Sequence, residues 1–227
     1  MCFSAGASFA GGAVITAIGM MTVSRNIDPS RRMFAAIPLI FGVQQISEGF
    51  VWVALQSSGN DLILSIASYI FLFAAVVLWP FYLPLSVMLM EKEKNLRRLL
   101  MPFLVVGIVV SLYYVTRLLV NEIEPRIFSH HIKYTGNFPQ QRALIVFAGY
   151  AAATLIPLFI SSGSKMWLLG LLMATSCLIT GIFFKEYLTS VWCFFAALIS
   201  IVIYWIVTDN LLSFRPLAPT THDISNP

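Results

Sequence analysis

The stretch of sequence that decides the fold runs from Phe41 to Trp52 and reads Phe-Gly-Val-Gln-Gln-Ile-Ser-Glu-Gly-Phe-Val-Trp. It lies in the middle of an apolar run, Met33–Leu55, that is long enough to cross a bilayer as a helix. Such a helix carries Glu48 close to the hydrocarbon midplane, where an ionisable side chain costs about 2.5–3.5 kcal/mol on insertion scales. The stretch therefore predicts a membrane-spanning helix with a polar site on it.

The composition extends this prediction to the whole chain. Of the 227 residues, 59% are hydrophobic and 11% are charged, whereas about a quarter of the residues of a soluble domain are charged. The apolar excess is spread along the full length. The formal net charge of +4 is small, and most basic residues lie in short loops between apolar runs, which argues for topology signals and against a nucleic-acid-binding surface.

Seven apolar runs have the length of a membrane span. We expect an all-α membrane protein with seven transmembrane helices in a single domain, residues 1–214, followed by a polar, disordered tail, residues 215–227. The expected spans are Phe3–Val23, Met33–Leu55, Leu62–Met90, Leu99–Val120, Ala143–Ile160, Met166–Phe184 and Val191–Leu212.

Three local features refine this expectation. Small residues of the first span, such as Gly11 and Gly12, allow a neighbouring helix to approach closely. Pro80 and Pro84 favour a kink in the third run, after which we expect the chain to bend towards the membrane interface. The long loop Asn121–Arg142 contains apolar residues, and we expect part of it to lie on the membrane surface.

The orientation follows from the lysine and arginine positions, because cytoplasmic loops carry an excess of these residues. If the N-terminus is outside and the C-terminus is in the cytoplasm, most of the lysine and arginine residues of the loops lie in the cytoplasm. The cytoplasmic set is Arg25, Arg31, Arg32, Lys92, Lys94, Arg97, Arg98, Lys165 and Arg215, against Arg126, Lys133, Arg142 and Lys185 outside. Trp79 is then expected in an inner aromatic belt.

The first candidate ligand- or ion-binding residues lie on one face of the helix expected for the second span. Gln44, Glu48 and Trp52 are spaced i, i+4 and i+8, so they share a face, and Gln45 neighbours Glu48 at i, i+3. One reading makes Glu48 a proton- or cation-binding carboxylate in a polar cavity that opens outward. The other makes it a hydrogen-bonded link between helices.

Two residues of the fourth span extend this candidate site. Arg117 and Tyr113 lie in its last third, in the same outer half of the membrane as Glu48. Arg117 could pair with Glu48 if the second and fourth spans are neighbours, and such a pair would fit either reading.

Metal, cofactor and enzyme chemistry find little support. Cys2, His130, His131 and Cys193 are expected on one side of the membrane, yet they have none of the usual zinc spacings and remain weak candidates, so we expect no metal site. The seventh span has no lysine for a retinal Schiff base, and no expected span has a histidine for haem. Known hydrolase, nucleotide-binding and metalloprotease motifs are absent, so we expect no cofactor, and no motif indicates an enzymatic activity.

The N-terminus and the second span carry a resemblance. Met-Cys-Phe-Ser-Ala-Gly-Ala-Ser-Phe at Met1–Phe9, with the motif Phe-Gly-Val-Gln-Gln at Phe41–Gln45 and Glu48-Gly49, resembles a family of small, uncharacterised bacterial multi-span proteins. The resemblance covers about the first two spans. It implies one bacterial membrane domain and lends no activity, cofactor or partner.

Three functions stay open. The leading hypothesis is a small-solute or ion transporter of the bacterial cytoplasmic membrane, in which Glu48 takes up a proton or cation and Gln44 and Gln45 orient the ligand. The second is a sensor or accessory subunit that binds a ligand or partner through the same face. The third is a membrane enzyme. Expected partners are the lipid bilayer and a small solute or cation.

Overall fold

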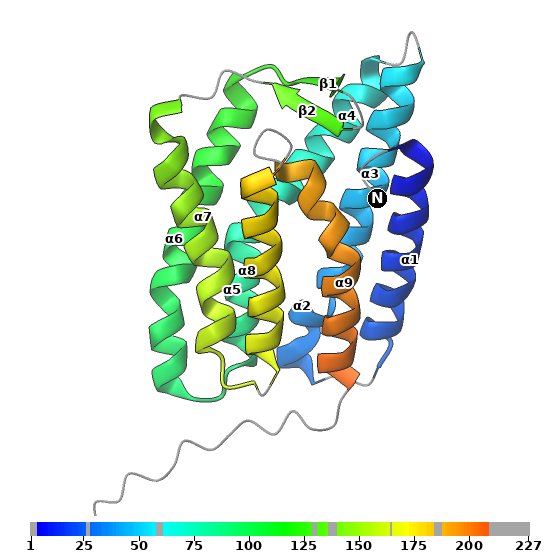
Figure 1. The fold of residues 1–227 in the computed structure, drawn as a ribbon. Helices are drawn as coiled ribbons and strands as arrows, with labels where there is room; N and C mark the ends of the chain where they lie inside the picture. The colour runs from blue at the N-terminus through cyan, green and yellow to red at the C-terminus, as the bar shows by residue number, and fades with distance from the viewer. Residues whose placement is uncertain are drawn as a thin grey trace, which may run out of the picture.

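Helices make up nearly all of the chain that the structure, a computed structural model, describes. The described residues are 4–25, 28–57, 61–128, 131–135, 140–163, 165–183 and 188–208. The long helices run up and down in one bundle, with a β-hairpin at its upper end and the end of the last helix at its lower end (Figure 1). The expected tail, residues 215–227, lies outside the described residues.

The first two long helices pack closely because glycine removes the side chains between them. α1 (Ala5–Val23) is capped by Ser4, whose hydroxyl accepts a hydrogen bond from the amide of Ala7. A Cβ at Gly12 of α1 would lie 2.7 Å from the Ile46 side chain, and one at Gly42 would collide with Thr16. The predicted close approach at the first span is therefore an α1–α3 contact.

The second apolar run begins with short turns and continues as one long helix. Those elements are η1 (Pro29–Arg31), α2 (Arg32–Ala35) and α3 (Ile37–Gln56). Asp28 caps η1, since its carboxylate accepts hydrogen bonds from the Ser30 amide and hydroxyl at 3.0 and 2.9 Å.

The third run is an interrupted helix, made of α4 (Asp61–Leu72), a π-helical segment η2 (Phe73–Leu78) and α5 (Trp79–Met90). Proline at position 80 has no N–H for the carbonyl of Val76, so the regular α-helical ladder cannot pass through this point. The expected bend towards the interface was wrong. α5 stays inside the bundle, where Leu83 and Val87 are buried in the main core.

The remaining long helices complete the bundle. They are α6 (Lys94–Val120), α7 (Gln140–Ile160), α8 (Met166–Phe183) and α9 (Leu188–Thr208). The main core gathers buried side chains from α2, α3 and α5 to α9, so it lies along the bundle axis.

A β-hairpin departs from the all-α expectation. β1 (Glu124–Phe128) and β2 (His131–Thr135) pair antiparallel within the loop expected on the membrane surface. Ile132 is buried against Val51 and Trp52, and the Tyr134 ring stacks on Phe71 at 5.1 Å. Part of this loop therefore closes the upper end of the bundle.

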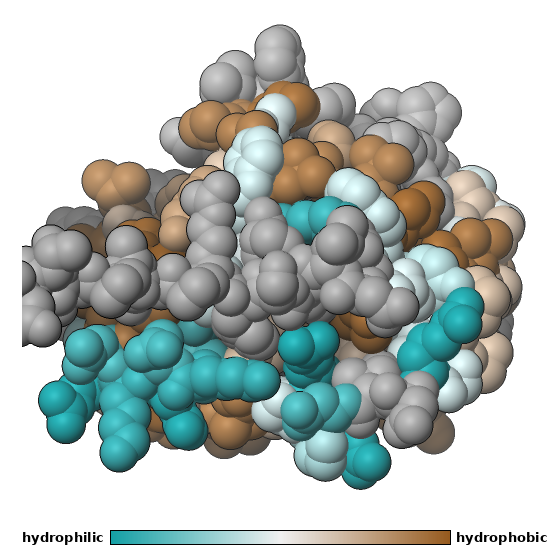
Figure 2. All heavy atoms as spheres, turned by 90° about the horizontal axis from the view of Figure 1, so that it is seen from below, coloured by the Kyte–Doolittle hydropathy of each residue, from teal (hydrophilic) through white to brown (hydrophobic). Residues whose placement is uncertain are grey.

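The outer surface of the bundle is suited to lipid. Within the described residues, four helical segments are long and apolar enough to cross a membrane: Ala5–Val23, Pro29–Gln56, Asp61–Met90 and Lys94–Val120. Three shorter apolar helical stretches accompany them. Large apolar side chains such as Val105, Val109 and Leu112 are exposed on the sides of the bundle. Hydrophilic side chains gather at its lower end, as Figure 2 shows.

Candidate functional site

The polar face of α3 is inside the bundle. The exposed fractions of Gln44, Gln45 and Glu48 are 3%, 1% and 0%, and Trp52 is also buried. The Gln45 amide nitrogen donates to the Glu48 carboxylate at 3.1 Å. The structure thus brings together the four residues that the i, i+4 spacing had grouped, and removes them from solvent.

The polar groups beside Glu48 are incompletely satisfied. Within the described residues, the buried Oε1 of Gln45, the indole Nε1 of Trp52 and the hydroxyl of Ser68 on α4 have no hydrogen-bond partner. α3 ends at Gln56 and the antiparallel α4 begins at Asp61, so Ser68 lies at about the level of Glu48. Buried polar atoms of this kind commonly contact ordered water or an ion.

Gln44 also lines a central cavity. The cavity has a volume of about 120 Å³ and is bounded by α3, η2, α5, α6, α7, α8 and α9. The Gln44 side-chain oxygen accepts a hydrogen bond from the Trp79 indole at 2.9 Å. Trp79 was expected in an interfacial belt, yet it is buried in the cavity wall.

The cavity lies against the interruption of the third helix. The Tyr150 hydroxyl donates to the Ala75 carbonyl at 2.7 Å, and the Ser111 hydroxyl donates to the Val77 carbonyl at 2.6 Å. Thr154 donates in turn to the Tyr150 carbonyl at 2.9 Å. Tyr150 of α7 and Ser111 of α6 thus satisfy two carbonyls of the π-helical segment, which stabilises the irregular backbone inside the bundle.

Sequence reasoning missed Tyr150, Thr154 and Trp79 as members of this site. A tyrosine and a threonine in an apolar span are ordinary, and no spacing rule links α7 to η2. The sole local signal was Pro80, which marks the interruption.

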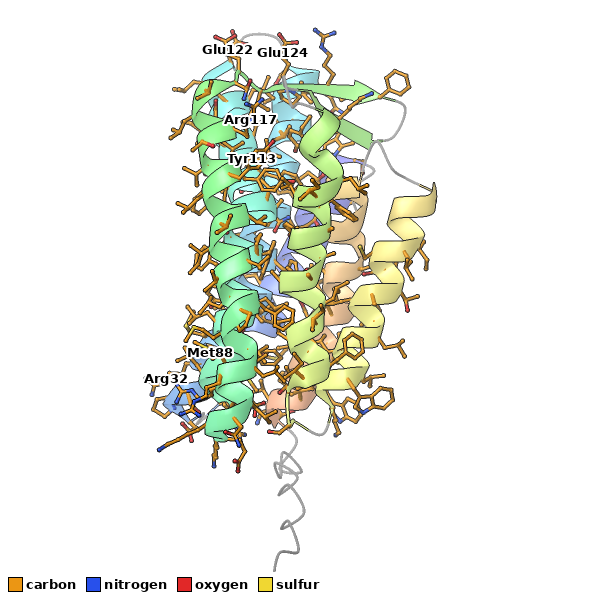
Figure 3. The ribbon with its side chains drawn as sticks, turned by 90° about the vertical axis from the view of Figure 1, so that its left-hand side faces the viewer. Arg32, Met88, Tyr113, Arg117, Glu122 and Glu124 are labelled. Atoms are coloured by element: carbon orange, nitrogen blue, oxygen red, sulfur yellow. The ribbon has the colours of Figure 1, made fainter. Side chains whose placement is uncertain are left out.

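Arg117 and Tyr113 lie on α6, which packs against η2, α5 and α7. Figure 3 shows Arg117 just below the hairpin, with Glu122 and Glu124 beyond it. Along the described helices, α3 and α6 have no extended contact. Tyr114, the neighbour of Tyr113, lines the central cavity.

The side chains of the weak metal candidates all lie outside the described part of the chain. Cys2 and His130 lie outside it, and the side chains of His131 in β2 and Cys193 in α9 lie outside it as well. Among the described residues no group of three or more histidine, cysteine, aspartate or glutamate side chains is placed to hold a metal ion.

A second buried carboxylate, Glu91, lies at the lower end of the bundle and is 3% exposed. Its oxygens accept hydrogen bonds from the Ser161 hydroxyl at 2.7 Å, the Ser162 amide at 2.8 Å and the Ser162 hydroxyl at 2.7 Å. Glu91 therefore ties the end of α5 to the turn between α7 and α8.

These features define a class of protein: a helical bundle of membrane-spanning type, with a buried acidic face and an internal cavity beside an interrupted helix. The chain belongs to DUF6629, a family of unknown function whose sequence pattern matches residues 1–215. No curated protein and no solved structure matches the chain.

Proposed function

We propose that the protein is a seven-span transporter of the bacterial cytoplasmic membrane that carries a small solute through the central cavity. The observation that carries this proposal is the cavity of about 120 Å³ beside η2. Substrate sites of many transporters lie near the bilayer midplane at interrupted helices, where freed backbone groups face a cavity. The π-helical turn of residues 73–78 supplies such an interruption.

Glu48 is the proposed proton or cation site of this transporter. It is fully buried one helical turn beyond Gln44, which faces the cavity, and it accepts a hydrogen bond from Gln45. A carboxylate inside a membrane bundle is a functional candidate because its insertion is costly. Gln44 couples the two regions, since it lies on the same helix as Glu48 and contacts Trp79 in the cavity wall.

The proposed orientation places the lower end of the bundle in the cytoplasm. Exposed basic residues gather there, namely Arg25, Arg32, Lys92, Lys94, Arg97 and Arg98. The hairpin at the upper end carries fewer, and its Arg126 is paired with Glu124 at 2.7 Å. The excess of basic residues at the lower end agrees with the positive-inside rule if this end is cytoplasmic and the N-terminus is outside.

A ligand sensor or accessory subunit is the second candidate. The observation that favours it is that contacts between separate elements hold both ends of the bundle together. The hydrogen bonds of Glu91 hold α5 to the α7–α8 turn, and Ile132 and Tyr134 of the hairpin are packed into the upper end. Contacts that hold both ends closed suit a protein that binds a ligand without alternating access.

The experiment uses proteoliposomes that hold a pH-sensitive dye and are exposed to a panel of small uncharged solutes. A transporter coupled through Glu48 moves protons inward when its solute is added, and Glu48→Gln abolishes that movement because the amide cannot release a proton. Glu93→Gln, at an exposed lower-end position, is the matched control and retains it. Solute binding without proton or solute movement by the wild type would favour the sensor.

A further inference from the structure

The side chains that line the central cavity carry no charge. Among the described residues the wall is built from apolar side chains such as Phe41, Leu169 and Ile203, together with a few neutral polar groups. An ion placed there would lose its hydration without gaining a counter-charge, a cost of several kcal/mol or more. The cavity therefore selects an uncharged ligand.

The size of the cavity limits the ligand further. An apolar cavity of about 150 Å³ engineered in another protein takes up benzene. The volume of about 120 Å³ found here is of the same order, so it fits a molecule of single-ring size. A flexible chain of that volume would lose more conformational entropy on binding than a ring.

One polar group of the cavity is available to a ligand. The hydroxyl of Tyr150 is engaged with the Ala75 carbonyl, and the indole N–H of Trp79 is engaged with Gln44. The hydroxyl of Tyr114 makes no hydrogen bond within the described residues, although its ring lines the cavity and contacts Tyr113. A ligand with one hydroxyl or carbonyl group would satisfy it.

We propose that the central cavity binds an uncharged molecule of single-ring size that carries one hydrogen-bonding group, and that this group pairs with the Tyr114 hydroxyl. The inference deepens the proposed function, because it names the class of solute for the same cavity. It does not depend on movement of the solute across the membrane.

The test follows the fluorine NMR signal of three probes added to the purified full-length protein in detergent: 4-fluorophenol, 4-fluorotoluene and 4-fluorobenzoate. The wild type should give a saturable bound signal for the first two probes and none for the charged benzoate. Val76→Phe fills the cavity and should remove both bound signals, whereas Val109→Phe, on the exposed side of α6, should leave them unchanged.

Tyr114→Phe tests the hydrogen bond. It should weaken 4-fluorophenol binding by about five- to tenfold, as expected for one lost hydrogen bond, and leave 4-fluorotoluene unaffected. Tyr69→Phe, at an exposed position of α4, should change neither. Bound signals that survive Val76→Phe, a benzoate signal as strong as that of the phenol, or a Tyr114→Phe effect equal for both neutral probes would overturn the inference. Probe binding by a wild type that moves no solute in proteoliposomes would refute the transporter proposal and leave this inference standing.

Discussion

Three residues with carboxylate side chains differ in their burial and in their hydrogen-bond partners. Glu48 is buried beside Gln45 in the middle of the bundle, and Glu91 is buried at its lower end among three serine hydrogen bonds. Asp28 is exposed and caps a short helix. Glu91 joins two parts of the chain that are about 70 residues apart, so we assign it a structural role, whereas Glu48 is the proposed proton or cation site.

Replacing Glu91 with alanine should destabilise the protein by about 1.5–3 kcal/mol, the usual range for hydrogen bonds to a charged group. The change leaves the donors of Ser161 and Ser162 without their acceptor. Thermal unfolding of the purified protein measures the loss. Glu93→Ala is the control, because Glu93 is exposed and its side chain caps nothing, and it should be within about 0.5 kcal/mol of the wild type. Equal effects of the two substitutions would contradict the role of Glu91.

Asp28 should make stability depend on pH in the acidic range. The Ser30 backbone amide, followed by the Ser30 hydroxyl, holds the pKa of this carboxyl below its usual value of 3.8. A lowered folded-state pKa adds stability that is fully present above that usual value and is lost as the pH falls through the folded-state pKa. The unfolding temperature of the wild type should therefore exceed that of Asp28→Asn at neutral pH, and the difference should shrink below pH 3.8. A difference independent of pH would show that the charge is irrelevant.

The interrupted helix α4–η2–α5 is the element that shapes the cavity. Gly107 of α6 allows the close approach that holds it, since a Cβ at that position would collide with the carbonyl of Pro80. Gly107→Ala should therefore destabilise the protein by about 1–3 kcal/mol or more through overpacking. Gly6→Ala on α1 is the matched control, because a Cβ there meets no atom within 4 Å. Denaturant or thermal unfolding compares the two, and an intact Gly107→Ala protein would mean that α6 can shift away from Pro80.

The sequence could predict the helices of the bundle because hydropathy records length and apolar character directly. It could also predict that Gln44, Glu48 and Trp52 share a face, since helical spacing is local. The hairpin could not be predicted, because the apolar residues Ile132 and Tyr134 read equally well as membrane-surface contacts. Their burial depends on α3 and α4, which only the folded chain brings beneath them.

The candidate site likewise combines features that are local in the sequence with features that depend on the folded chain. The polar residues of α3 could be grouped from helical spacing alone, whereas the cavity depends on side chains from helices far apart in the chain. Tyr150 and Ala75 are 75 residues apart, and neither has a distinctive neighbour in the sequence. The expected bend after Pro80 failed because proline indicates an interruption but not the direction in which the next helix packs.

At the scale of the whole molecule, the orientation can be tested by labelling. Single cysteines at Glu93 and at Arg126, each in a background without Cys2, Cys177 and Cys193, lie at opposite ends of the bundle and are exposed. An impermeant maleimide added to intact cells should label Arg126→Cys and leave Glu93→Cys unlabelled until the cells are opened. The reverse pattern would refute an N-terminus outside.

The hydrogen bonds of Glu91 also bear on the order in which the chain is made. Its serine partners follow it by about 70 residues, so α5 and α6 are synthesised and inserted well before Ser161 exists. During that interval the carboxylate has to remain hydrated at the membrane surface. Docking of the α7–α8 turn then withdraws it from water, which makes completion of the C-terminal half of the bundle the step that seals this end of the protein. A chain truncated before Ser161 would lack these partners and would keep Glu91 exposed to water.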